Sequence, residues 1–181
     1  MTKLVFRLYF DYEKEEAWLN KMAREGWMLK SFFLGFFRFV KDEPGKYIYR
    51  IELLPHHFRS PKNKTYFDFL KDMDVEIISF WVLWVIYRRK TDLGPFDIYS
   101  DIESRITHYG RISRFLLPLG LIEVGCAIYM VFSLSEKPEI SELIILSFAL
   151  IFAYVILSTA LKMQGKRLRL IKEKQVLESI D

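Results

Sequence analysis

The sequence is poor in the residues that build disulfides, metal centres and phosphate-binding loops. It holds one cysteine in 181 residues, which excludes a disulfide framework and a cysteine-rich zinc site. Three histidines leave little material for a histidine-based metal centre, and eight scattered glycines form no phosphate-binding loop. No Ser-His-Asp arrangement is recognisable. We therefore expect a protein that is not an enzyme and binds no metal or cofactor.

Apolar residues are abundant by contrast. Hydrophobic residues make up 51% of the chain and aromatic residues 17%, which excludes intrinsic disorder. Charged residues still reach 28%, although the mean hydropathy is +0.09. These values are compatible if charged and apolar residues are concentrated in different parts of the chain.

Two long apolar segments occupy the second half of the chain. Residues 115–135 contain one charged residue, Glu123, and residues 143–161 contain none. Because a bilayer core is crossed by about 20 apolar helical residues, both segments are predicted to span a membrane. The loop 136–142 is short enough to join them as a helical hairpin. The alternative is a pair of buried helices in a soluble protein.

Basic residues predict the orientation of this hairpin. They flank its two open ends and are scarce in its loop, which holds Lys137 among three glutamates. The flanking residues are Arg105, Arg111, Arg114, Lys162, Lys166, Arg167, Arg169, Lys172 and Lys174. We therefore expect a plasma-membrane protein with both termini in the cytoplasm. No secretory signal peptide is expected, since the first twelve residues contain Lys3 and Arg7 and no long apolar run.

Residues 1–92 have the pattern of a folded cytoplasmic domain. Residues 4–10 alternate as a half-buried strand, and Asp11 is suited to cap a following helix. Glutamates in its first turn are favoured by the helix dipole, and Gly26 is suited to its C-terminal end.

The rest of this domain is predicted to add three strands and one helix. Strands are expected at 28–41, 46–54 and 75–87, and a helix at about 62–73. The last strand is expected to be buried, and either bent or folded as a tight hairpin near Ser79. The order strand-helix-strand-strand-helix-strand predicts an α+β, ferredoxin-like domain with one sheet and two helices.

Two charged segments are predicted to flank the membrane. Residues 93–114 are expected to form a linker helix. Residues 162–181 are basic, and we expect a helix on anionic lipid headgroups or, alternatively, a frayed solvated tail. The candidate headgroup contacts are Lys166, Arg167, Arg169 and Lys172.

Several motifs resemble a bacterial family, domain of unknown function 2812. The segment EAWLNKMAREGW at 16–27 resembles its WLN-x-MA-x-x-GW signature. Similar short motifs are YIYR at 47–50, YRRK at 87–90 and YSDIESR at 99–105. The resemblance covers about residues 3–114, and it departs at 73–75, where the family has a Gly-Trp pair. It implies the fold, paired transmembrane helices and frequent proximity to PadR-type transcriptional regulators, but no catalytic residues.

A few residues are candidates for binding. Glu123 lies inside a predicted span, where an ionisable group is costly and often functional; it pairs with a partner, relays a proton, or is neutral and bonded to Ser147, Ser158 or a symmetry mate. An exposed sheet face is the other candidate site. Its aromatic residues are predicted to be Phe33, Phe37, Phe39, Tyr47, Tyr49, Trp81 and Trp84.

The remaining polar candidates are predicted to be structural or solvated. His56 and His57 are expected in an exposed loop, and His108 at the surface near the headgroups. Cys126 is not expected to be a thiolate, because apolar surroundings raise the pKa of a thiol.

Three functions fit these observations. The first is a membrane-anchored regulatory or sensory module that binds a partner protein or a hydrophobic ligand. The second is an accessory subunit of a transporter or another membrane complex, with the hairpin as interface. The third, an enzyme acting on lipid or a metabolite, lacks a recognisable polar site. Expected partners are the lipid bilayer and either a second copy or another membrane protein. No nucleic acid is expected, since residues 1–92 carry a net charge of only +4.

Overall fold

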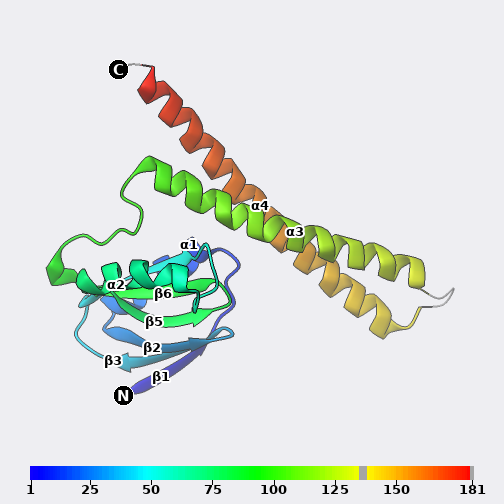
Figure 1. Ribbon diagram of the computed structural model, residues 1–181. Coiled ribbons are helices and arrows are strands. Elements are labelled where there is room, and N and C mark those ends of the chain that lie inside the picture. Colours follow the sequence, from blue (N-terminus) through cyan, green and yellow to red (C-terminus); the bar gives the residue numbers. More distant parts are fainter. Residues whose placement is uncertain (135–137, 180–181) are drawn as a thin grey trace. The chain divides into compact units, whose positions relative to one another are not determined.

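The chain divides into two units, and the computed structural model describes residues 1–134 and 138–179. The first unit, Met1–Ile98, contains strands and helices, and the second, Tyr99–Asp181, is built from two long helices (Figure 1). The predicted α+β domain followed by a helical hairpin is therefore confirmed at this level.

The first unit contains six strands and two main helices. Their bounds are β1 (Thr2–Phe6), α1 (Tyr12–Arg24), β2 (Trp27–Phe33), β3 (Phe36–Lys41), β4 (Tyr47–Leu53), α2 (Lys64–Asp72), β5 (Glu76–Trp81) and β6 (Trp84–Lys90). Short 3-10 turns lie at Pro61–Asn63 and Thr91–Leu93. The strands form two antiparallel sheets, sheet A with the order β1-β3-β2 and sheet B with the order β4-β6-β5.

The ferredoxin-like order is not confirmed. Each of two segments predicted as one strand, 28–41 and 75–87, is instead a hairpin of two strands. The tight-hairpin alternative for the second segment was correct in kind, but its turn lies at 82–83 rather than near Ser79. The unit is consequently a β-α-β-β motif that occurs twice, with two three-stranded sheets in place of one sheet of four.

The two motifs match each other at a constant spacing of 48 residues from the helix onward. The register shift between Leu29 and Ser31 recurs between Ile77 and Ser79. Helix α1 ends at Arg24 and α2 at Asp72, and the positive φ of Leu34 in the first hairpin recurs at Val82. Backbone bonds also correspond, since Gly26 donates to Ala23 as Asp74 does to Lys71. The first unit is therefore an internal tandem repeat.

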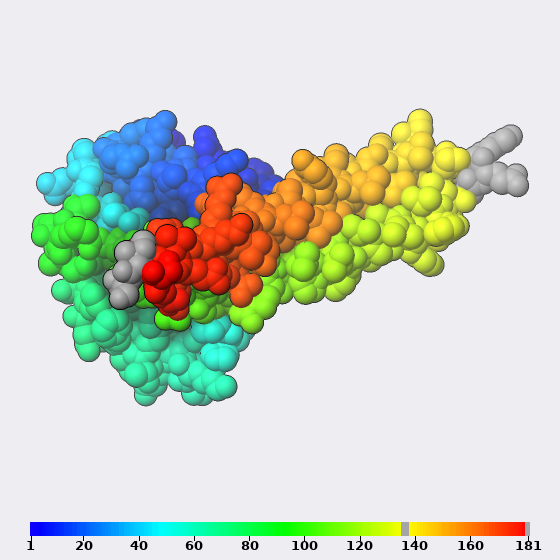
Figure 2. All heavy atoms as spheres, turned by 90° about the horizontal axis from the view of Figure 1, so that it is seen from above, coloured from blue at the N-terminus to red at the C-terminus, as the bar shows by residue number. Residues whose placement is uncertain are grey.

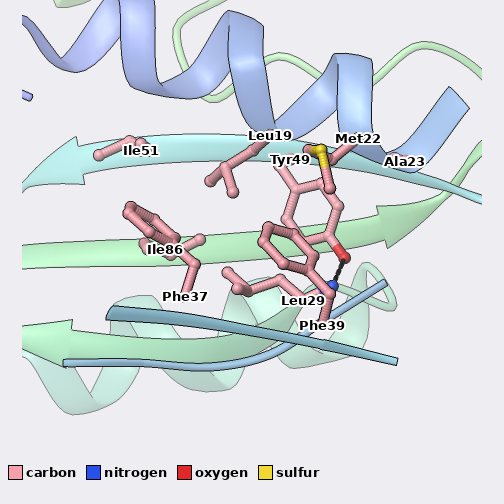
Figure 3. Close-up of a cluster of buried hydrophobic side chains, with 9 residues drawn as sticks. All are labelled: Leu19, Met22, Ala23, Leu29, Phe37, Phe39, Tyr49, Ile51 and Ile86. Carbon is pink, nitrogen blue, oxygen red and sulfur yellow. Dashed lines mark hydrogen bonds between the residues drawn. The ribbon is translucent and has the colours of Figure 1, made fainter. Parts of the chain in front are cut away.

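A single core joins sheet A, sheet B and α1. Nine buried side chains form it: Leu19, Met22, Ala23, Leu29, Phe37, Phe39, Tyr49, Ile51 and Ile86 (Figure 3). The Tyr49 hydroxyl accepts a hydrogen bond from the Leu29 backbone N–H at 2.8 Å and so links the two sheets within this core. The phenol thus buries its ring and satisfies a backbone donor at the same time.

Helix α1 also covers the free edge of sheet B. The Asn20 side chain donates to the Tyr49 carbonyl at 3.0 Å and accepts from the Tyr49 N–H at 2.8 Å. The Glu16 carboxylate accepts from the Ile51 N–H at 2.9 Å. These groups take the place of a neighbouring strand, which an edge strand otherwise leaves open to pairing. They explain why strand β4 ends the sheet without a further partner.

A second core lies between sheet B and α2. It contains Leu54, Leu70, Val75, Val85, Tyr87 and Phe96. Beside it, the buried carboxylate of Glu52 accepts hydrogen bonds from the hydroxyls of Tyr66 at 2.8 Å and Tyr87 at 3.1 Å. Sheet B is therefore covered on both faces, by the first core on one side and by α2 on the other.

The second unit is an antiparallel pair of helices, α3 (Ile102–Ser133) and α4 (Ile140–Glu178), which lie against each other (Figure 2). Lys174 forms an ion pair with Glu103, and the Arg167 side chain covers Gly110. Further along, Leu157 packs on Gly120. From each of these contacts to the next, the number of residues advanced along α3 equals the number moved back along α4. The two helices therefore keep one antiparallel register over this length.

Small residues allow this close packing. Ser113, Gly120 and Ala127 are buried at seven-residue intervals on α3, and Ala153 and Ala160 are buried with the same interval on α4. Such residues let two helix backbones approach closely in an apolar environment. Ala153 of the predicted Ala149–Ala153 pair is buried in the interface, whereas Ala149 is only half-buried.

The helices extend well beyond the apolar segments. The predicted linker 93–114 is not a separate helix, because its residues from Ile102 onward belong to α3. The basic segment continues α4 as far as Glu178, so the helical alternative for the tail is confirmed over that range. The predicted loop 136–142 lies partly outside the described residues, and its end already belongs to α4.

Candidate functional site

The first unit exposes aromatic and aliphatic side chains at the tips of its two hairpins. Phe33, Leu34 and Phe36 lie at the β2–β3 turn, and Phe80, Trp81 and Val82 lie at the β5–β6 turn. The Ser79 hydroxyl donates to the Phe32 carbonyl at 2.9 Å. Phe32 and Ser79 each lie one residue before the exposed residues of their own hairpin tip. The two tips are therefore neighbours on the surface of the unit.

The structure divides the seven residues of the predicted aromatic face. Phe37, Phe39 and Tyr49 are buried core residues, so they cannot be reached from the surface. Tyr47 and Trp84 are half-buried, and Phe33 and Trp81 are exposed. The accessible set is thus smaller than expected, and it gains Phe36 and Phe80, which were not singled out.

Glu15 has an unusual setting on α1. It lies one turn before the buried Leu19 and is itself half-buried. Within the described residues its carboxylate has no hydrogen bond or ion pair, although its backbone N–H donates to the Asp11 carbonyl. Loss of solvent raises the pKa of Glu15 from 4.5 to about 7. The sequence suggested only a favourable helix first turn, because the residue's burial depends on tertiary packing.

This raised pKa predicts a loss of stability between pH 4.5 and 7. The folded state holds the Glu15 proton more tightly than the unfolded state, so unfolding becomes easier as the pH rises through this window. Replacing Glu15 with glutamine should remove the effect and stabilise the unit at pH 8 by about 3 kcal/mol. Denaturant unfolding of the full chain at pH 5 and pH 8 measures it. The control is Glu25→Gln, at an exposed position, which should keep the pH dependence of the wild type. If the free energy of unfolding depended on pH equally in the wild type and in Glu15→Gln, the prediction would be refuted.

Glu123 is half-buried on α3, three residues after Gly120 and four before Ala127. It therefore borders the packed face of the helix pair. In the described part of the chain its carboxylate forms no hydrogen bond or ion pair. The hydroxyls of Ser147 and Ser158 instead donate to carbonyls of their own helix, at Leu143 and Val155.

Two of the four predicted headgroup-binding residues are engaged within the helix pair. Lys166 lies over the Tyr109 ring at 5.6 Å, and Arg167 packs on Gly110. Arg169 and Lys172 are exposed. These two cations on α4 are therefore accessible to groups outside the helix pair.

His108 differs from the expectation of a surface residue. It is 2% exposed, and its Nδ1 lies 2.8 Å from the Tyr99 hydroxyl. His56 and His57, which follow each other in the sequence, are exposed as predicted. Among the described residues, no three His, Cys, Asp or Glu side chains are grouped in a way that could hold a metal ion.

Both helices of the second unit are long and apolar enough to cross a membrane. Large apolar side chains such as Ile122, Phe148 and Ile151 are exposed along them. This exposure supports membrane association over the alternative of helices buried in a soluble core.

A known protein family matches residues from both units of the chain. Residues 11–121 match the family described as Protein of unknown function (DUF2812). The chain belongs to this family. The match begins at Asp11, which caps α1. It includes the rest of the first repeat and all of the second, and it ends within α3. No curated protein and no solved structure matches the chain.

The residues Trp18, Leu19 and Asn20, which resemble a family motif, each have a structural function in the first unit. Trp18 packs edge-on against Phe37 and Phe39, with ring centroids 4.8 and 5.5 Å apart. Leu19 is fully buried, and Asn20 holds the β4 backbone. The three residues thus assemble the fold of the first repeat and its contact with the second. Sequence reasoning identified the motif but could not assign Asn20 to the edge of a distant strand.

Proposed function

We propose that the chain is a membrane-anchored regulatory module of the cytoplasmic face. Its first unit recognises a partner protein or a hydrophobic ligand, and the helix pair keeps that unit at the bilayer. The observation that supports this most strongly is the exposed hairpin tip Phe80, Trp81 and Val82 in a chain that also carries two candidate spans. Exposed apolar clusters of this kind are typical of interaction sites.

The proposal places both termini in the cytoplasm and assigns no catalytic step. The open end of the helix pair is rich in lysine and arginine, which favours retention on that side. Two acids of the first unit have structural contacts, since the buried Glu52 accepts hydrogen bonds from two tyrosine hydroxyls and the half-buried Glu16 accepts one from the β4 edge.

Photocrosslinking in native membranes tests the binding site. A photoreactive phenylalanine analogue at Trp81 of the full chain should give one dominant product, because this side chain is 44% exposed at the tip. The same analogue at Lys71, exposed on α2, serves as the control. The same pattern of products from both positions would count against the proposal.

Glu123 supports a second candidate, an accessory subunit of a membrane complex. A carboxyl group at the border of the helix interface, without a partner in the described chain, is suited to pair with a basic residue of another membrane protein. Pull-down of the detergent-solubilised chain should then recover a specific membrane protein that Glu123→Gln loses. Recovery of the chain alone, unchanged by the substitution, would exclude this candidate.

A further inference from the structure

Within the described first unit, no other element covers the outer face of sheet A. Cross-strand register places Phe6, Phe36 and Phe33 in one row, and Leu4, Arg38 and Ser31 in the next. The residues between these rows point the other way, into the core, as Val5 and Phe37 do. Phe6 and Phe36 are in contact, with ring centroids 4.8 Å apart. The row of three phenylalanines is 48% to 66% exposed.

The internal repeat shows how unusual this exposure is. Leu4 and Arg38 pair across sheet A as Ile51 and Ile86 pair across sheet B. The sheet B pair is 4% exposed at each residue, because α1 and sheet A pack over it. Thus the chain covers this face in its second repeat and leaves the corresponding face of the first repeat open.

Charge identifies the kind of surface that fits. Residues 1–10 and 26–41, which contain all of sheet A, hold five basic residues and no aspartate or glutamate. Arg38 projects one row behind the phenylalanines, and Lys30, in the bulge of β2, is exposed. The rows are about 7 Å apart, from the rise of two strand residues. The apolar side chains therefore lie nearest the hairpin tip, and the cations lie one row farther from it.

We propose that the outer face of sheet A, with its tip at Leu8 and Leu34, docks on the surface of an anionic phospholipid bilayer. Its phenylalanine row would enter the boundary between headgroups and acyl chains, where apolar faces insert by about 5–10 Å. Arg38 and Lys30 then lie at the level of the phosphates. The two candidate spans raise the local concentration of the face at that surface.

Other occupants fit less well. A second copy packed face to face would bring Arg38 of both copies together without an acidic partner on either face. A nucleic acid would use flat stacking surfaces, whereas Leu4, Leu8 and Leu34 contribute aliphatic groups that are 47% to 67% exposed. Lipid docking is independent of which partner the β5–β6 tip binds.

An environment-sensitive fluorophore at the tip tests this proposal in the full chain. The label is placed on Leu34→Cys after the native Cys126 is changed to serine, and on Lys71→Cys as the control site on α2. The chain is reconstituted in vesicles of phosphatidylcholine, alone or as a two-to-one mixture with phosphatidylglycerol. We expect the Leu34 label to move to shorter emission wavelengths and to be quenched by lipid-borne quenchers only in the mixed vesicles. The Lys71 label should stay aqueous in both.

Charge reversal provides the matched variants. Lys30→Glu with Arg38→Glu should lower the docked-to-undocked ratio by about twentyfold or more, at about fivefold for each basic residue near the surface. Lys62→Glu with Lys64→Glu makes the same charge change at exposed positions outside sheet A and should have no such effect. Tryptophan emission verifies folding, because all four tryptophans lie in the first unit.

Three results would overturn the proposal. The first is a Leu34 label that is equally aqueous in both kinds of vesicle. The second is a shift that follows protein density rather than anionic lipid, which would identify a second copy as the occupant. The third is a shift produced by added RNA in vesicles of phosphatidylcholine alone.

Discussion

Replacing Asn20 with leucine is expected to lower the free energy of unfolding of the first unit by about 3 kcal/mol. The substitution removes both hydrogen bonds to the Tyr49 backbone and leaves that N–H and carbonyl without their partners. It also opens the edge of sheet B. Denaturant unfolding of the full chain in detergent, followed by tryptophan fluorescence, reports on this unit alone, since the second unit has no tryptophan.

Two further variants separate hydrogen bonding from packing at this site. Asn20→Asp retains an acceptor for the Tyr49 N–H but loses the donor to the Tyr49 carbonyl, so its loss should be intermediate. Lys21→Ala, at the exposed next position of α1, should change stability little. Equal stability of Asn20→Leu and Lys21→Ala would show that the edge contact does not hold the two repeats together.

Replacing Gly120 with leucine should separate the helix pair. Even a Cβ atom at this position would lie 2.5 Å from Leu157 Cδ2 and 2.7 Å from its Cγ, so Leu157 must shift for a Cβ alone. The full leucine side chain needs more space, and the helices are expected to move apart. We expect a loss of about 2 kcal/mol or more from this overpacking. The readout is bis-maleimide crosslinking between Glu103→Cys and Lys174→Cys in a Cys126→Ser chain, measured as SDS is added to mild detergent micelles. Crosslinking should fail at a lower SDS fraction.

Gly125 is the matched control on the same helix. A Cβ there would meet nothing within 4 Å, so Gly125→Leu should leave the crosslinking midpoint unchanged. If Gly120→Leu and Gly125→Leu behaved alike, the small-residue interface would not determine pairing of α3 and α4.

The best-predicted element was α1, because local chemistry specifies its ends. The Asp11 carboxylate accepts from the Glu13 N–H at 3.1 Å, as its capping position indicated. Gly26 adopts a φ of 78° just after the helix, which confirms its terminating function. Such signals act over a few residues and can be read directly from a sequence.

The sequence predicts 28–41 as one strand, and 75–87 as a bent strand or a tight hairpin, because the turns of both hairpins carry weak sequence signals. Leu34-Gly35 and Val82-Leu83 connect the strands without Asn-Gly or Asp-Gly, and the flanking residues are all large and apolar. A continuous apolar run therefore resembled one long strand. When each segment is taken as a single strand, the tandem repeat is not visible and the element order matches the ferredoxin-like pattern.

The candidate surfaces were only partly predictable. Alternation separates Phe36 from Phe37, but it does not indicate which face the rest of the chain covers. Packing of α1 across sheet B buries Tyr49 and leaves Phe33 outside. The position of Glu123 within an apolar helix was visible in the sequence, whereas its place beside Gly120 and Ala127 required the register of the helix pair.

We propose that the helix pair crosses a membrane twice, with the first unit on the same side as the end of α4. Cysteine labelling in sealed vesicles of known orientation tests it most directly, using single-cysteine chains at Lys71, Ser141 and Gln175 after Cys126→Ser. All three positions are exposed. A membrane-impermeant maleimide should reach Lys71→Cys and Gln175→Cys only from the cytoplasmic side, and Ser141→Cys only from the opposite side. Labelling of all three positions from one side would contradict this topology.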